Sequence, residues 1–135
     1  MRPYAKKIVK PWGYEIIITP PDSTMVGKIA FTKAGKRWSF QYHDLKEENI
    51  CLLKGKAEIW LENDKGVVEK MTMTKMKGYQ IKPFKKHRFC AVDDCFSFEV
   101  STKEEGNTFR LEDDYRRPTE TEVLRKQPNR GWKEN

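Results

Sequence analysis

Several features that define other classes of protein are scarce or missing in this chain of 135 residues. No apolar run approaches the roughly 18 residues of a membrane-spanning helix. The basic N-terminus is not followed by the apolar stretch of a signal peptide. The three cysteines, Cys51, Cys90 and Cys95, lack the spacing of a zinc ribbon. We therefore expect a cytoplasmic protein with reduced thiols and no membrane partner.

The sequence also lacks the signatures of nucleic-acid binding. It has no zinc-finger spacing, no aromatic RNA-binding motif and no recognition helix, so we expect no nucleic-acid partner. Its formal charge is +7, but lysine and arginine are spread along the chain and are often interleaved with acids. Two interpretations of this charge remain open: a solvated surface, or attraction of a small anionic ligand such as a sugar phosphate or a nucleotide.

A sustained helical pattern is missing as well, since no interior stretch repeats apolar residues at the 3.6-residue period over three turns. Short segments rich in β-branched and aromatic residues follow one another instead, separated by turn residues. They predict an all-β, single-domain barrel or sandwich over residues 1–118, with an N-terminal strand arm. Residues 119–135 are expected to form a polar C-terminal tail, in which "TETEVLRKQ" favours a short helix. The predicted strands are "YEIIIT", "MVGKIAFT", "RWSFQYH", "NICLLKG", "KAEIWLEN", "VEKMTMT", "YQIKPF", "HRFCAV" and "CFSFEVST".

Histidine is the scarcest chemically useful residue, with only two in the chain. His43 ends "RWSFQYH", where strand alternation would place Arg37, Ser39 and Gln41 on its face and the aromatic residues on the other. An imidazole and an amide oxygen on one face, with Glu48 returning on the next strand, are suitable ligands for a first-row metal ion. This spacing alone leaves open both a metal site and a structural histidine.

Two stretches resemble the two motifs of the cupin superfamily. "GKRWSFQYHDLKEENICLLKG" gives Gly35, five residues, Gln41-x-His43, four residues, Glu48, six residues and Gly55. "GYQIKPFKKH" gives Gly78, Pro83 and His87, although its Gly-to-Pro gap is one residue shorter and Phe84-Lys85 replaces the end of Pro-x-Gly. The resemblance implies a jelly-roll β-barrel and brings His87 to the same site.

Within the cupins, "KPWGYEII", "WSFQYH" and "FRLEDDYRR" are similar to the C-terminal cupin domain of type II mannose-6-phosphate isomerases. Asp44, Leu45 and Asn49 stand in a region where that branch tends to be histidine-rich. The resemblance implies one divalent metal ion, with zinc favoured over iron, manganese or nickel. Its implied ligands are Gln41, His43, Glu48 and His87.

Sugar isomerisation also needs a base and cations that hold the phosphate. Alternation in "CFSFEVST" would turn Glu99 toward the barrel interior, where burial raises a carboxyl pKa, so Glu99 is the candidate catalytic base. An ion pair with a structural role is the alternative for Glu99. The candidate substrate-binding residues are Arg37, on the ligand face of its strand, and Lys28 and Arg110, which match basic positions of the isomerase branch. Each of the three is also explained as plain surface charge.

The function predicted from these residues is a metal-binding cupin that isomerises a phosphorylated aldose and ketose. The alternatives are a sugar or sugar-nucleotide binding cupin without turnover, and an iron-dependent oxygenase. The expected ligand is a small anionic molecule of the sugar type. We also expect a homodimer, with "KIVKPWGYEIII" as the contact, because an exposed sheet edge seeks a partner.

Overall fold

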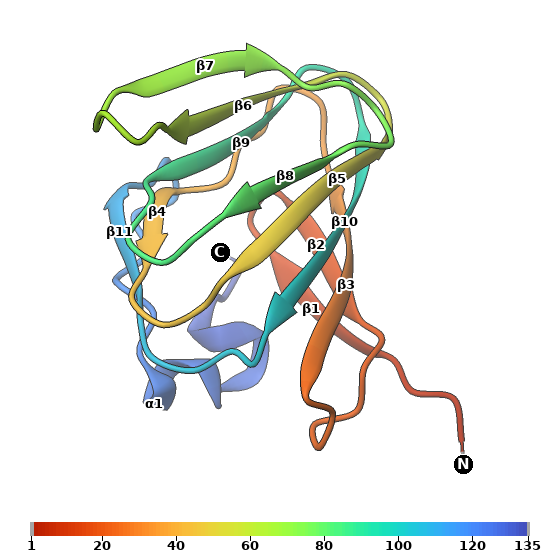
Figure 1. Ribbon diagram of the computed structural model, residues 1–135. Helices are drawn as coiled ribbons and strands as arrows, with labels where there is room; N and C mark the ends of the chain where they lie inside the picture. The colour runs from red at the N-terminus through yellow and green to blue at the C-terminus, as the bar shows by residue number, and fades with distance from the viewer. Residues whose placement is uncertain (1, 135) are drawn as a thin grey trace.

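Two antiparallel sheets face each other in the computed structural model, which describes residues 2–134 (Figure 1). The strands are β1 (Lys6–Lys10), β2 (Gly13–Ile17), β3 (Met25–Thr32), β4 (Phe40–His43), β5 (Glu48–Lys54), β6 (Ala57–Glu62), β7 (Val68–Thr72), β8 (Gly78–Ile81), β9 (His87–Ala91), β10 (Cys95–Thr102) and β11 (Thr108–Glu112). One sheet has the order β1-β2-β3-β10-β5-β8 and the other β11-β4-β9-β6-β7. The predicted all-β, single-domain fold is confirmed.

Strand alternation determines which side chains face the space between the sheets. Along β5, Glu48, Ile50 and Leu52 are each about 1% exposed, whereas the intervening residues are partly exposed. The apolar members of such inward rows form one continuous core. The indole of Trp38 lies at its centre, stacked on Trp12 at 5.2 Å and on Phe89 at 4.8 Å between ring centroids. Burial of these rings, with the aliphatic side chains around them, stabilises the fold.

The predicted alternation along "RWSFQYH" is wrong for Arg37 and Trp38, whereas Ser39 faces inward with Gln41 and His43 as predicted. Strand β4 begins only at Phe40, so the residues before it do not follow the period of two. Trp38 and Ser39 are both buried, although they are neighbours in sequence, and Arg37 lies at the surface. From Phe40 onward the expected pattern holds, because Gln41 and His43 both face the barrel interior.

Backbone conformation explains two positions of the cupin-like motifs. Gly55 has φ = +96°, and a β-carbon there would lie 2.3 Å from the carbonyl oxygen of Asp94, so only glycine fits. Phe84, which departs from the second motif, adopts φ = +66°. Its N–H donates to the carbonyl of His43 at 2.7 Å. The turn before His87 is therefore formed despite the unusual residue.

The C-terminal segment, residues 119–134, folds back over one end of the barrel (Figure 1). It contains α1 (Glu122–Arg125), where a short helix was predicted, and the 3-10 turn η1 (Pro128–Gly131), which packs against β1. Neither element buries an apolar residue. The segment is attached by polar contacts, including the bridge between Thr108 and Glu120. Met1 and Asn135, which end the two predicted segments, lie outside the described residues.

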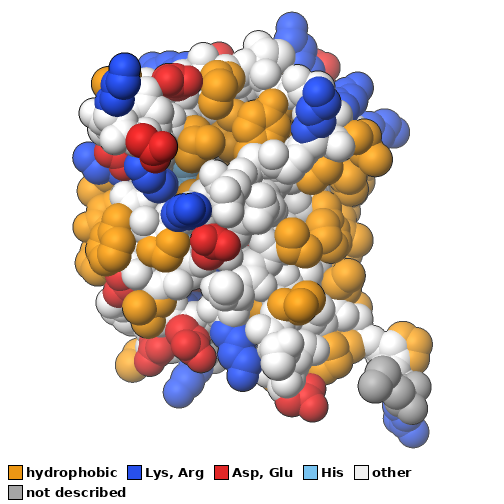
Figure 2. Space-filling model, viewed as in Figure 1, with side chains coloured by type: hydrophobic (Ala, Val, Ile, Leu, Met, Phe, Trp, Pro, Cys, Tyr) orange, Lys and Arg blue, Asp and Glu red, His pale blue; other side chains and the backbone are white. Residues whose placement is uncertain are grey.

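No helix among residues 2–134 is long and apolar enough to cross a membrane. The three cysteines are free thiols; Cys95 is buried and the other two are half-buried. On the face shown in Figure 2, lysine and arginine side chains stand at separate places, both at the margin and within the face, and several of them lie beside aspartate or glutamate. This favours the interpretation of those surface charges as a solvated surface.

Candidate metal centre

Three buried side chains from three strands converge inside the barrel. His43 ends β4, Glu48 begins β5 and His87 begins β9. One ligand atom from each lies within 4.8 Å of the others. Glu48 Oε1 is 2.9 Å from His87 Nε2 and 3.4 Å from His43 Nε2. Two imidazoles and a carboxylate at this separation could hold one metal ion.

Outer hydrogen bonds orient both imidazoles. His87 Nδ1 lies 2.9 Å from the carbonyl oxygen of Lys85, which can only accept, so Nδ1 donates and Nε2 is the ring atom that faces Glu48. His43 Nδ1 lies 2.9 Å from the hydroxyl of Thr108, which fixes that ring in the same way when Nδ1 donates. Partners of this kind orient the histidines of metal sites.

The atoms that converge are poor partners for one another but good partners for a cation. His43 Nε2 and Glu48 Oε1 are buried without a well-formed hydrogen bond, and Glu48 Oε2 faces the Lys46 ammonium at 3.0 Å. Burial, followed by the nearby Lys46 ammonium, lowers the pKa of His43 to about 4, so its ring is neutral. Burial alone would raise the pKa of Glu48, but Lys46 and the histidines hold that pKa well below its usual range. A carboxylate and a neutral imidazole are the protonation states that bind metal, so Glu48 and His43 fit a divalent ion, and His87 Nε2 lies within reach of the same ion.

Gln41 lies beside this cluster. It pairs with His87 across β4 and β9, and its Nε2 is 3.4 Å from His87 Nε2. Its Oε1 accepts a hydrogen bond from Ser39 at 2.6 Å. A flip of the Gln41 amide exchanges its oxygen and nitrogen. The Ser39 hydroxyl can donate to the oxygen or accept from the nitrogen, so the flipped oxygen can face the histidines. The placement agrees with a fourth ligand, and the four-ligand set stays a prediction.

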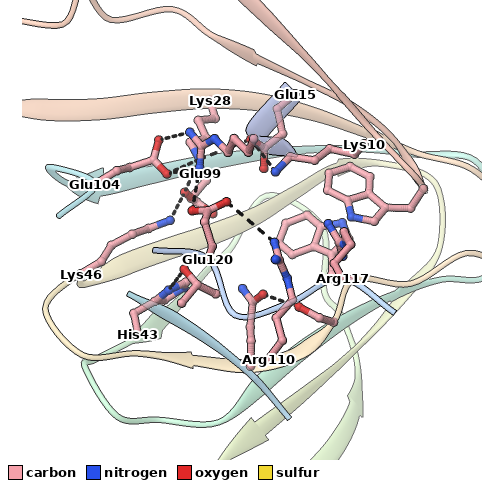
Figure 3. Close-up of a pocket in the computed structure, with 16 residues that line it drawn as sticks. Lys10, Glu15, Lys28, His43, Lys46, Glu99, Glu104, Arg110, Arg117 and Glu120 are labelled. Atoms are coloured by element: carbon pink, nitrogen blue, oxygen red, sulfur yellow. Dashed lines mark hydrogen bonds and ion pairs between the residues drawn. The ribbon is translucent and has the colours of Figure 1, made fainter. Parts of the chain in front are cut away.

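The cluster borders an inner cavity, which has about 40 Å³ of free space and is lined by His43, Gln41 and many charged side chains (Figure 3). Six of the lining residues are cations and four are carboxylates. An excess of buried positive charge favours an anionic ligand. The cations are Lys10, Lys28, Lys46, Arg110, Arg117 and Arg130.

A chain of ion pairs runs through the inner cavity from the metal cluster to the C-terminal segment. Lys46 Nζ is 3.0 Å from Glu48 and 3.0 Å from Glu99. Lys28 Nζ is 3.9 Å from Glu99 and 2.9 Å from Glu104. Glu104 in turn accepts two hydrogen bonds from Arg130, at 2.7 and 2.8 Å. The two ends of the cavity are therefore electrostatically connected.

Glu99 lies where its alternation in β10 predicts, buried and facing the inner cavity. Burial and the nearby Glu48 carboxylate raise the pKa of Glu99 to about 7, although Lys46 and Lys28 oppose this change. A carboxyl group that titrates near neutral pH can both accept and return a proton. The geometry is compatible with the role of base as well as with an ion pair to lysine.

The three predicted substrate-binding residues lie in different places. Lys28 and Arg110 line the inner cavity, and their side chains are 4% and 8% exposed. Arg37 is not among the residues that line it. It forms a two-pronged ion pair with Asp114 at 2.7 and 2.9 Å on the surface, because it precedes the regular part of β4. The structure thus places Lys28 and Arg110 in the inner cavity beside the cluster and leaves Arg37 outside.

Sequence analysis missed most of the cavity's charges. Lys46 could have been found, because it lies between the motif residues His43 and Glu48. Glu104 precedes β11 in an irregular segment, and Glu120 and Arg130 belong to the segment that was expected to be a tail. No periodicity marks an irregular segment as facing inward, so their burial was not predictable.

Several solved structures share this architecture. CapF with the inhibitor 3-isopropenyl-tropolone aligns over 82% of this chain with a TM-score of 0.68 and 17% identity. The capsular polysaccharide assembling protein CapF from Staphylococcus aureus aligns over 86%, with a TM-score of 0.63 and 16% identity. A variant of oxalate decarboxylase from Bacillus subtilis aligns over 73%, with a TM-score of 0.64 and 15% identity. The aligned parts are 35%, 33% and 27% of those chains, so this chain spans about a third of their length.

These neighbours are cupin-fold proteins, and the predicted cupin fold is confirmed. At this level of identity the likeness concerns the fold alone. No protein-family model matches the sequence, and no curated protein matches it in sequence. The similarity to mannose-6-phosphate isomerases therefore stays a prediction.

Proposed function

We propose that this protein is a metal-dependent cupin that isomerises a phosphorylated aldose and its ketose. The observation that carries the proposal is the buried cluster of His43, Glu48 and His87 beside a cation-rich cavity that also contains Glu99. We propose Gln41 as the fourth ligand and zinc as the metal ion, with iron, manganese and nickel as the other candidates.

Each part of the reaction has a candidate group. A divalent ion bound by the cluster would supply Lewis-acid polarisation of the sugar's carbonyl and hydroxyl oxygens. Glu99, with its pKa near 7, accepts the proton from one carbon and returns it to the next. Lys28 and Arg110 attract the phosphate into the cavity. The walls around these groups exclude water from the reacting carbons.

Entry of the substrate requires movement of the C-terminal segment. Pockets for organic ligands usually measure about 300–1,000 Å³, whereas the inner cavity has about 40 Å³ of free space. Arg130 and Glu120, both in that segment, close it by ion pairs and not by apolar packing. Glu104 is the ion-pair partner of Lys28 and Arg130. A phosphate that replaces Glu104 as their partner would favour the open form of the C-terminal segment.

Two other functions are each favoured by one observation. The closed cavity, with its lysines already paired, suits a sugar or sugar-nucleotide sensor that binds without turnover. Two histidines and one carboxylate are also the ligand set of iron-dependent oxygenases. Metal analysis separates the candidates: zinc supports the isomerase, iron the oxygenase, and absence of stoichiometric metal the sensor.

The direct test is a screen of phosphorylated aldoses and ketoses with the metal-loaded protein. We expect kcat/KM for the best substrate to fall at acid pH, because Glu99 acts as a base only when it is deprotonated. Glu99→Gln should reduce kcat at least a hundredfold, about the contribution of general base catalysis. Glu105→Gln, an exposed carboxylate, should leave kcat unchanged. Equal activity of Glu99→Gln and the parent would reject the proposed mechanism.

We further propose a cytoplasmic homodimer. Strand β1 is an edge of its sheet, in line with the contact predicted from "KIVKPWGYEIII". The N–H of Val9 already donates to Asn129 Oδ1 at 2.8 Å, so a second copy would pair with the remaining outer backbone groups of β1. Sedimentation at tens of micromolar protein tests this, and a purely monomeric species would argue against the dimer.

A further inference from the structure

A second cavity lies outside the inner one, between the loop after β11 and the C-terminal segment. This cavity, here called the arginine cleft, has about 310 Å³ of free space. Its lining includes five cations and no carboxylate. They are Arg110, Arg116, Arg117, Arg130 and Lys133. The absence of carboxylates from the lining distinguishes the cleft from the inner cavity, although Arg110, Arg117 and Arg130 have carboxylate partners behind the cleft wall.

Two of these arginines have nitrogen atoms that lack a partner. The side chains of Arg110 and Arg130 are only 8% and 9% exposed, and in each the Nε atom is buried without an acceptor. A buried donor without an acceptor costs about 1–3 kcal/mol, more for a charged group. Both residues also line the cleft, so an anion bound there would compensate part of their buried positive charge.

Arg116 adds an exposed cation at a backbone position that disfavours it. Its φ is +56°, in the left-handed region that glycine adopts without cost. No ion pair holds its side chain among residues 2–134. The neighbouring Arg117, in contrast, is fixed by Asp113 at 2.7–3.1 Å. A strained, unpaired cation beside fixed ones is typical of a position kept for a ligand.

Two aromatic side chains also line the arginine cleft. Trp132 is half-buried and meets Tyr115 edge-on, with ring centroids 6.3 Å apart. Leu124 and Pro118 continue this apolar wall. The cleft thus combines a flat apolar surface with donors for phosphate oxygens. A planar ring stacks on such a surface, and stacking contributes about 1–3 kcal/mol per base.

We propose that the arginine cleft binds a nucleotide, with its ring against Trp132 and its phosphates among Arg110, Arg116 and Lys133. The free space of about 310 Å³ is within the usual range for a small organic ligand. Because none of the metal-cluster residues lines the cleft, binding here needs neither the metal nor the isomerase activity.

Isothermal titration calorimetry of the full chain, with EDTA present, tests the proposal with uridine and adenosine diphosphate as probes. We expect one site per chain, and pyrophosphate or uridine alone should bind at least about tenfold more weakly. Arg116→Gly should weaken binding about tenfold by removing a charge-assisted contact. Since glycine relieves the backbone strain, this variant should melt no lower than the parent. Arg116→Lys should retain most of the affinity.

Trp132→Leu should weaken the diphosphates about fivefold or more but leave pyrophosphate unaffected. Lys77→Ala removes an exposed cation far from the cleft and should change affinity less than twofold. His87→Ala should bind the probes as the parent does, which separates this site from the metal centre. The proposal is overturned if neither diphosphate binds, if pyrophosphate binds as tightly as they do, or if Lys77→Ala and Arg116→Gly have equal effects.

Discussion

The two ends of the barrel interior are equally buried but chemically opposite. Along β5, Glu48 belongs to the metal cluster, and Ile50 and Leu52 belong to the apolar core. Along β9, His87 belongs to the cluster and Phe89, two residues later, to the core. The same strands and the same inward faces therefore build both regions. Where a strand passes from one to the other, only the chemistry of the inward residue changes.

This difference shows which region provides stability and which provides chemistry. An apolar side chain gains about 1.5–3 kcal/mol on burial. Removing an ion from water costs several kcal/mol of free energy, which attraction to its partner must offset. The chain of ion pairs from Lys46 to Arg130 is thus a weak source of stability for its size. Such charges are expected to be kept for binding or catalysis, and the core to carry the fold.

The comparison predicts that the cluster can be disabled without loss of the fold. His87→Ala and His43→Ala should each abolish stoichiometric zinc binding, with an affinity loss of about a hundredfold or more, since even outer partners of metal ligands contribute about 10–100-fold. Gln41→Ala should weaken binding less, because the neutral amide is the weaker ligand. Competition with a chromophoric chelator measures the affinities, and circular dichroism reports the fold.

Glu47→Gln is a matched control, because it changes the carboxylate beside Glu48 without touching the cluster. It should bind zinc like the parent protein. If His87→Ala binds zinc as tightly as the parent, the proposed ligand set is wrong and the sensor becomes the better function.

The same comparison explains what the sequence could predict. Alternation places Glu99 on the inward face correctly, and motif spacing brings together His43, Glu48 and His87. Alternation failed at Arg37, because residues before Phe40 are not in a regular strand. Alternation could not predict the burial of Arg130, which depends on a left-handed turn in an irregular segment. Periodicity predicts regular elements, whereas the closing segment is positioned by long-range ion pairs.

The core should respond in the opposite way to the cluster. Ile59 is fully buried among apolar neighbours, and Ile59→Ala should lower the free energy of unfolding by about 2–5 kcal/mol through lost burial and the resulting cavity. Zinc affinity of the molecules that remain folded should change less than threefold. Urea unfolding in the presence of EDTA, and zinc titration below the unfolding transition, measure the two quantities. A large loss of zinc affinity in Ile59→Ala would show that the two regions are not separable.

Acid should destabilise the charged end of the barrel interior more than the apolar core. Burial alone would raise the pKa of Glu120, but Arg130, Lys10 and Arg125 lower it to about 2. Because its folded pKa lies below the unfolded value near 4.5, the stabilisation is present above about pH 4.5 and is lost as the pH falls toward 2. The contribution is on the order of 2–3 kcal/mol. Glu120→Gln should therefore lower the free energy of unfolding at pH 7 and reduce its dependence on pH between 4.5 and 3.

Glu105→Gln is the matched control, because Glu105 is exposed and it should retain the parent's pH dependence. Urea unfolding at pH 7, 4.5 and 3 in the presence of EDTA gives the pH dependence of the free energy of unfolding for the parent, Glu120→Gln and Glu105→Gln. Limited proteolysis at pH 3 should cleave first in the C-terminal segment, whose attachment depends on these ion pairs. If Glu120→Gln keeps the full slope of the parent, the acid-sensitive stability belongs to other carboxylates, and the segment is held mainly by its backbone contacts.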